Sequence, residues 1–187
     1  QFVSDLEKNV IEFVSAYKNV FTNALLFAIM KDSRTRIRRS RMDKIERYID
    51  ELLEKSTPDR PIWNIEKILQ GKKSTWNYID GCMIKAILEM YAITKDEKYF
   101  KFADSFIDCN VREDGSIEGF SVSELNIDNV NAGKTLFELY DLTGKEKYRK
   151  AIDLVYSQIE QMPRTKEGNF WHKNIYPNQV WLDGLYM

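Results

Sequence analysis

Residues 89–104, EMYAITKDEKYFKFAD, return 49 positions later as residues 138–153, ELYDLTGKEKYRKAID. Eight of the aligned positions are identical. Each copy runs from the end of an apolar segment, through a short Thr-Lys or Thr-Gly turn, into a segment with the spacing of an amphipathic helix. This order predicts an αα-hairpin, and hairpins repeated at about 50 residues predict an all-α array. In such an array the apolar helix of each pair lies inside and the amphipathic helix lies outside.

The rest of the chain also favours helices. Apolar residues at three- and four-residue steps predict one long helix over residues 1–30. A basic segment, residues 31–44, leads into an amphipathic helix over residues 45–53. Acidic residues interrupt this segment and no aromatic residues alternate with its cations, so we interpret it as a solvated helix face rather than a nucleic-acid surface. A short helix over residues 65–69 and a mostly apolar helix over residues 82–91 follow, and strand signals are nearly absent.

Bulk composition limits the classes of partner. The 187 residues carry a net charge of −1, with 43% hydrophobic and 30% charged residues, so nothing draws the chain toward nucleic acid or an anionic membrane. No run approaches the roughly 18 apolar residues of a membrane span. Cys82 and Cys109 lie outside any CxxC pattern, so they predict neither a disulfide scaffold nor a zinc site. We therefore expect a reduced, cytoplasmic setting.

Aspartates recur at the predicted starts of the inner helices. The three related tetrapeptides are YIDG (residues 78–81), NIDN (residues 126–129) and WLDG (residues 181–184). If the hairpins surround an axis, Asp80, Asp128 and Asp183 gather at one central cleft. A capping role is the alternative, since aspartate is a favoured helix N-cap. Two carboxylates that face one pocket can divide into an acid and a base, which is what glycoside chemistry requires.

The last stretch, residues 170–187 (FWHKNIYPNQVWLDGLYM), combines aromatic rings with the single histidine of the chain. Aromatic faces stack on sugar rings, while His172, Lys173 and Asp183 can bind hydroxyl or carboxylate groups. This mixture favours a polar ring substrate. A loop of core aromatics followed by a helix start is the alternative interpretation.

A family resemblance rests on these same residues. The segments that carry it are RT (164–165), GNFWHK (168–173), YPNQ (176–179), WLDGLYM (181–187) and NIDN (126–129). Together with the 55-residue separation of Asp128 and Asp183, they resemble glycoside hydrolase family 105, the unsaturated rhamnogalacturonyl hydrolases. The related family 88, the unsaturated glucuronyl hydrolases, is the nearest alternative. The resemblance covers about residues 45–187.

The resemblance implies an (α/α)6 toroid that removes a 4,5-unsaturated uronic acid from the non-reducing end of a lyase product, without a metal or an organic cofactor. Asp183 is implied as the general acid/base, and Asp128 as the residue that holds substrate hydroxyls and tunes Asp183. His172 and Lys173 match family positions near the substrate, where a cation can pair with the uronate carboxylate. The further candidates for substrate binding are Trp181, Trp171, Trp76, Tyr78 and Asp80.

The toroid of the family contains more helices than this chain supplies. We therefore expect residues 31–187 to form the N-terminal half of the ring, truncated at the C-terminus, with residues 1–30 as a helix outside the resemblance. An open half-ring exposes apolar edges, which a second copy of the chain is able to cover. Two functions follow: an unsaturated uronyl hydrolase, or a non-catalytic helical-repeat domain that binds sugar or acts as a scaffold.

Overall fold

The structure is a computed structural model in which residues 42–72 and 76–187 are described. The chain divides into two units, Gln1–Tyr48 and Ile49–Met187. The helix expected over residues 1–30 lies outside the described residues. Residues 42–54 are helical, in agreement with the amphipathic pattern of residues 45–53.

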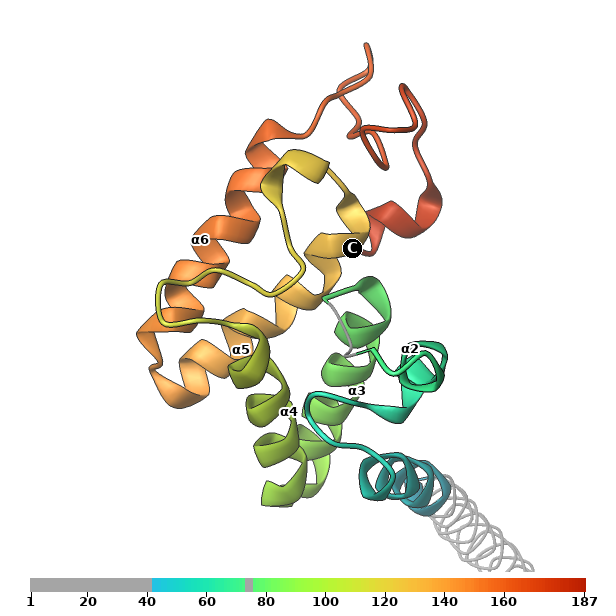
Figure 1. Cartoon of the computed structure of the whole chain (residues 1–187), viewed down its shortest axis with the longest axis vertical. Coiled ribbons are helices and arrows are strands. Elements are labelled where there is room, and N and C mark those ends of the chain that lie inside the picture. Colours follow the sequence, from blue (N-terminus) through green and yellow to red (C-terminus); the bar gives the residue numbers. More distant parts are fainter. Residues whose placement is uncertain (1–41, 73–75) are drawn as a thin grey trace, which may run out of the picture. The chain divides into compact units, whose positions relative to one another are not determined.

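The second unit contains two αα-hairpins joined by short 3-10 helices (Figure 1). Its elements in chain order are η1 (Ile62–Asn64), α2 (Ile65–Leu69), α3 (Tyr78–Thr94), α4 (Glu97–Asn110), η2 (Val122–Glu124), η3 (Ile127–Gly133), α5 (Lys134–Thr143), α6 (Glu146–Gln161) and η4 (Leu182–Leu185). Within residues 42–72 and 76–187, strand pairing is limited to isolated bridges, so the all-α class is confirmed. None of the described helices has the length and apolarity needed to cross a bilayer.

The repeated threonine explains why both hairpins turn in the same way. The Thr94 hydroxyl donates to the Met90 carbonyl (2.7 Å) and accepts the Asp96 N–H (3.2 Å). In the second hairpin the Thr143 hydroxyl makes the equivalent bonds, to Leu139 at 2.6 Å and from the following lysine at 3.3 Å. The residue after each threonine adopts a left-handed conformation, which ends the first helix.

The N-cap positions of the inner helices are occupied by residues other than the three aspartates. Asn77 caps α3, because its side-chain oxygen accepts the N–H groups of Ile79 (2.8 Å) and Asp80 (3.1 Å). Asn126 caps η3 through the Asp128 N–H (3.1 Å). Trp181 occupies the cap position of η4, without a side-chain bond. All three aspartates therefore lie inside the first turn, and the N-cap interpretation was wrong for each of them.

The two hairpins meet where α3 packs against η3. A Cβ on Gly81 would lie 2.6 Å from the backbone of Asn131 and Ala132, so only glycine permits this approach. The Asn131 side chain donates to the Tyr78 carbonyl (2.7 Å), and the buried Trp76 indole N–H donates to the Asn129 carbonyl (2.8 Å). These contacts fix the start of one inner segment against the next.

The outer helices are joined by a repeated tie from tyrosine to aspartate. The Tyr99 hydroxyl donates to Asp50 (2.8 Å) in the helix over residues 42–54, and the Tyr148 hydroxyl donates to Asp104 (2.7 Å) in α4. Lys145 also contacts Asp104, at 2.8 Å. Burial raises the pKa of Tyr99 to about 12 and raises the pKa of Tyr148 as well, so both hydroxyls remain protonated donors.

The repeat continues into the loops that follow the outer helices. Residues 111–117 (VREDGSI) and 164–170 (RTKEGNF) each form a tight turn closed by one antiparallel bridge. In both turns a glycine, Gly115 or Gly168, has a positive φ and donates to the carbonyl three residues earlier. The second turn carries the chain back toward η3.

Candidate active site

Backbone pairing brings Asp128 to the aromatic stretch. The Ile127 N–H donates to the His172 carbonyl (3.0 Å), and Asn126 and Lys173 form an antiparallel bridge. Since side chains alternate along paired extended segments, this register is what sets His172 and Lys173 beside the first turn of η3. Residues more than forty positions apart in sequence therefore meet at one point.

Each oxygen of the Asp128 carboxylate faces a nitrogen. Oδ1 lies 3.3 Å from His172 Nε2, and Oδ2 lies 2.5 Å from Lys173 Nζ. The His172 side chain is 1% exposed and the Asp128 side chain 16%, so solvent screens these contacts less than it screens a surface ion pair. The family resemblance implied that His172 and Lys173 bind a uronate carboxylate, whereas in the structure both side chains are directed at Asp128.

Stacked rings surround His172. Its imidazole lies parallel to the Trp181 indole, with ring centroids 4.2 Å apart and an interplanar angle of 9°. Tyr176 also stacks on Trp181, at 5.5 Å and 13°. A Cβ on Gly184 would come within 3.3 Å of His172 Nδ1, so the glycine of the WLDG segment gives η4 its close approach to the histidine.

Asp183 lies in η4 and is exposed. Its Oδ1 accepts the N–H of Gly184 (3.0 Å), and within the described part of the chain it forms no ion pair. Lys134 anchors the end of η4, because its Nζ donates to the Tyr186 carbonyl (2.7 Å) and lies 3.6 Å from the centre of that ring. Burial lowers the pKa of Lys134.

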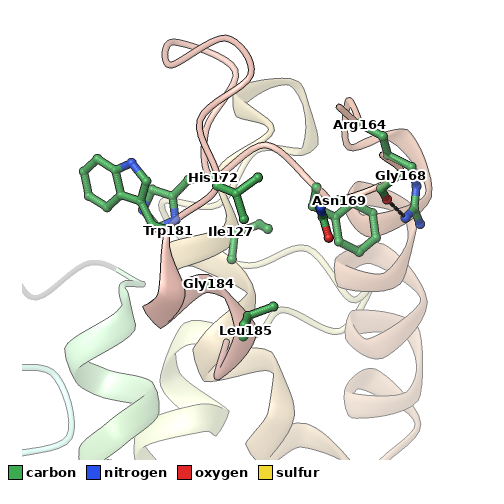
Figure 2. A pocket seen from close by; sticks show the side chains of 10 residues that line it. Ile127, Arg164, Gly168, Asn169, His172, Trp181, Gly184 and Leu185 are labelled. Carbon is green, nitrogen blue, oxygen red and sulfur yellow. Dashed lines mark hydrogen bonds between the residues drawn. The ribbon is translucent and has the colours of Figure 1, made fainter. Parts of the chain in front are cut away.

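A pocket of about 140 Å³ adjoins the histidine (Figure 2). Figure 2 shows His172 and Trp181 at one end, Arg164 and Asn169 at the other, and Ile127 between them. The other lining residues are Gly168, Phe170, Val180, Gly184 and Leu185. The pocket thus combines apolar and aromatic walls with an imidazole and a guanidinium, although neither Asp128 nor Asp183 lines it.

Two candidates from the first inner-helix start are buried. Asp80 is 0% exposed, and its Oδ1 accepts hydrogen bonds from the Trp63 indole and the Asn64 amide, both at 2.8 Å. Burial raises the pKa of Asp80 despite these bonds, and its Oδ2 has no hydrogen-bond partner among the described residues. Trp76 is 2% exposed and reaches Asn129 through its indole N–H.

The remaining aromatic candidates are more accessible. Tyr78 is 44% exposed. Trp171 is half-buried, and its backbone N–H donates to Pro163 (2.9 Å), while its buried indole nitrogen has no hydrogen-bond partner among the described residues. The structure thus joins Asp128, His172, Lys173 and Trp181 in one cluster through direct contacts.

Two residues that contact this cluster, Asn126 and Tyr176, were not among the site residues predicted from the sequence. Asn126 caps η3 and pairs with the Lys173 backbone, and Tyr176 stacks on Trp181. The signal for Asn126 was present, since an asparagine also precedes Asp80 at a cap position. Tyr176 lay within the quoted aromatic stretch, but its stacking depends on a turn that has no helical period.

Known proteins resemble this chain. It is 28% identical over 118 residues to the unsaturated rhamnogalacturonyl hydrolase YesR of Bacillus subtilis (strain 168), a match that covers 60% of this chain and 32% of the relative. A solved glycoside hydrolase of family 105 from C. acetobutylicum ATCC 824 is 50% identical, with a TM-score of 0.59, and the match covers 60% of this chain and 31% of that chain. The chain therefore spans about a third of the length of these relatives.

The structural likeness agrees with the partial (α/α)6 toroid expected from the sequence. The sequence profile described as Glycosyl Hydrolase Family 88 matches residues 44–187, which is most of the chain and includes both hairpins and the Asp128 cluster. The chain belongs to Glycosyl Hydrolase Family 88.

Proposed function

We propose that this chain carries the catalytic aspartates of an enzyme that releases a 4,5-unsaturated uronic acid from the non-reducing end of rhamnogalacturonan lyase products, and so acts in pectin degradation. The observation that carries the proposal is the buried contact of Asp128 with His172 beside the stacked Trp181. It occurs in a family member whose curated relative is an unsaturated rhamnogalacturonyl hydrolase.

The proposed reaction adds water across the C4–C5 double bond of the uronic acid. Asp183 donates a proton to C4, and a water molecule attacks C5 and gives a proton back to Asp183. The product is a hemiketal at C5, which opens and releases the remaining sugar. One carboxyl group thus serves as acid and then as base, and no proton is gained or lost overall.

Different surroundings support a division of roles between the two aspartates. Asp128 is held by two nitrogens, which suits a carboxylate that orients substrate hydroxyls and keeps its own position. Asp183 is exposed and forms no ion pair in the described part of the chain, which suits a group that exchanges protons.

The roles proposed for the other candidate site residues depend on whether their side chains are exposed or buried. Trp181, exposed over 41% of its surface, is assigned to stacking on a sugar ring, with Trp171 and Tyr78 as further ring contacts. Lys173 and His172 act through Asp128 in this proposal. Trp76 and Asp80 are buried, and we assign them to holding the first inner-helix start in place.

We also propose a cytoplasmic setting, with a sugar acid rather than nucleic acid or a membrane as the partner. Cys82 and Cys109 lie outside any CxxC pattern, which suits a reducing compartment.

The test is a turnover assay with an unsaturated rhamnogalacturonan disaccharide, followed through loss of the ultraviolet absorbance of its C4–C5 double bond. We expect Asp183→Asn to lower turnover by on the order of 10²–10⁴-fold, because the acid/base group is removed while the shape is retained. Asp153→Asn, an exposed aspartate on α6, is the matched control and should leave turnover unchanged. Undiminished turnover in Asp183→Asn would remove that residue from its role.

Two further outcomes separate the alternatives. Preference for an unsaturated glucuronyl disaccharide in the same assay would assign the glucuronyl activity instead. Binding of either disaccharide without turnover, detected through the Trp181 and His172 resonances, would support a non-catalytic sugar-binding domain.

A further inference from the structure

Gln158 is a buried amide on the outer helix α6. It is 0% exposed, and its Nε2 donates to the Asn126 carbonyl at 2.8 Å. Its Oε1 has no hydrogen-bond partner among the described residues. The other buried positions of this helix are Tyr148, Ala151, Ile152 and Val155. Burying an amide among such residues costs free energy, which a single hydrogen bond offsets only in part.

The hydrogen bond from Gln158 holds Asn126, the residue that connects η3 to the segment of His172 and Lys173. Asn126 caps η3 through the Asp128 N–H and pairs with Lys173 across the isolated bridge. The next residue donates to the His172 carbonyl. A displacement of the Asn126 carbonyl would therefore move Asp128 relative to both of its nitrogen partners.

The first hairpin has no amide at the equivalent position. The position 49 residues before Gln158 is Cys109, which is exposed and whose thiol donates to the Phe106 carbonyl of its own helix (3.2 Å). The buried amide of α4, Asn110, also donates within its own helix, to Phe106 (2.7 Å), so a buried amide that bonds to the start of an inner segment is found here in the hairpin that carries the Asp128 cluster.

We propose that Gln158 is a positioning residue for the candidate active site: by holding the Asn126 carbonyl, it sets Asp128 against His172 and Lys173. This inference rests on the proposed function only for the assignment of Asp128 to the candidate active site. The placement itself is a property of the folded chain and can be measured without turnover.

The test uses the imidazole resonances of His172, the single histidine of the chain, in the wild-type protein and in Gln158→Met. Methionine keeps the length of the side chain but cannot donate to Asn126. Asp128→Asn provides the reference for an imidazole that has lost its carboxylate. We expect the His172 resonances of Gln158→Met to move from the wild-type positions toward those of Asp128→Asn.

Two controls separate positioning from general stability. Gln161→Met removes an exposed amide from the same helix, one that bonds to Ser157 of its own helix, and should leave the His172 resonances in place. Tyr148→Phe weakens the fold at a distance and should lower the unfolding temperature without moving them. Wild-type resonances in a folded Gln158→Met protein would overturn the proposal.

If Gln158→Met does not fold, the hydrogen bond from Gln158 to Asn126 is tested in the wild-type protein instead. The side-chain amide protons of Gln158 should exchange slowly and show nuclear Overhauser contacts to the Ile127 Hα, which lies on the same side of the trans peptide as the Asn126 oxygen, and their absence would overturn the proposal. Failure of the hydrolase assay together with a displaced His172 signal would remove the proposed reaction and leave the positioning role intact.

Discussion

Asp80, Asp128 and Asp183 occupy related sequence positions but have different surroundings. Asp80 is fully buried between indole and amide donors, Asp128 is paired with two nitrogens, and Asp183 is exposed. A short tetrapeptide pattern therefore finds the residues, but their burial and contacts depend on other segments of the chain. We expect their substitutions to affect different properties: stability for Asp80, and function for the other two.

Asp80→Asn tests the buried carboxyl at the residue scale. Burial raises the pKa of Asp80 in the folded state, so the folded protein binds its proton more tightly than the unfolded chain does. This contribution to stability is fully present below the ordinary pKa, near 3.8, and is lost as the pH rises through the folded-state value. Relative to wild type, the free energy of unfolding of Asp80→Asn should therefore increase as the pH rises from about 4 to neutrality.

Chemical denaturation of both proteins over this pH range measures the difference. Asp96→Asn is a useful contrast, because the backbone N–H of Lys98 lowers the pKa of that exposed cap. Its stability relative to wild type should change in the opposite direction, and mainly below about pH 4, because the contribution of a lowered pKa is lost as the pH falls through the folded-state value. A difference between wild type and Asp80→Asn that stays constant with pH would contradict the predicted effect of burial.

At the scale of the elements, the hairpins were predictable because their determinants are local. The periodicity and the repeated threonine lie within a few residues of the turns they form, and the short helix expected over residues 65–69 is confirmed as α2. The repeated glycine loops carried a local signal that was overlooked, since DGS (114–116) and EGN (167–169) occupy equivalent places.

The surroundings of the candidate site were not predictable to the same degree. Residues 170–187 have no helical period, and their order comes from distant partners, such as the bond between Ile127 and the His172 carbonyl. The residue types near Asp183 suggested a site, whereas the contact of Asp128 with Lys173 depends on a register that no spacing within one segment encodes.

The tie between outer helices gives an element-scale prediction. Tyr148→Phe removes the hydroxyl that donates to Asp104, while Lys145 still pairs with that carboxylate. We expect the free energy of unfolding to fall by about 1.5–3 kcal/mol, the usual contribution of a hydrogen bond to a charged group. Tyr156→Phe, an exposed tyrosine on the same helix, should change it by less than about 0.5 kcal/mol. Equal effects of the two substitutions would refute the tie.

At the scale of the molecule, the second hairpin exposes positions that the first hairpin buries. Leu88 and Ile107 are 0% exposed, whereas their counterparts 49 residues later, Phe137 and Tyr156, are each 56% exposed. The Asp104 side chain is bonded by the next hairpin, and its counterpart Asp153 is exposed beside Arg149. The face of the second hairpin is thus equivalent to a surface of the first hairpin on which η3, α5 and α6 make contacts.

This exposed face should make the isolated chain self-associate. We expect concentration-dependent sedimentation, and we expect the double substitution Phe137→Ser and Tyr156→Ser to weaken it about tenfold or more, because two large apolar side chains leave the contact. Ile175→Ser, at a 72% exposed loop position, is the matched control. Unchanged association in the double variant would place the contact elsewhere.

The two partners of each hydrogen bond between outer helices are synthesised in a fixed order. Each aspartate precedes its tyrosine in the chain, Asp50 before Tyr99 and Asp104 before Tyr148. A ribosome therefore completes every acceptor before the matching donor emerges, so a new hairpin can dock on one that already exists. A gene that encoded the two hairpins in the reverse order would give a protein of the same composition. In that protein Tyr148 would be synthesised before Asp104, so the second hairpin could no longer dock on a first hairpin that is already complete.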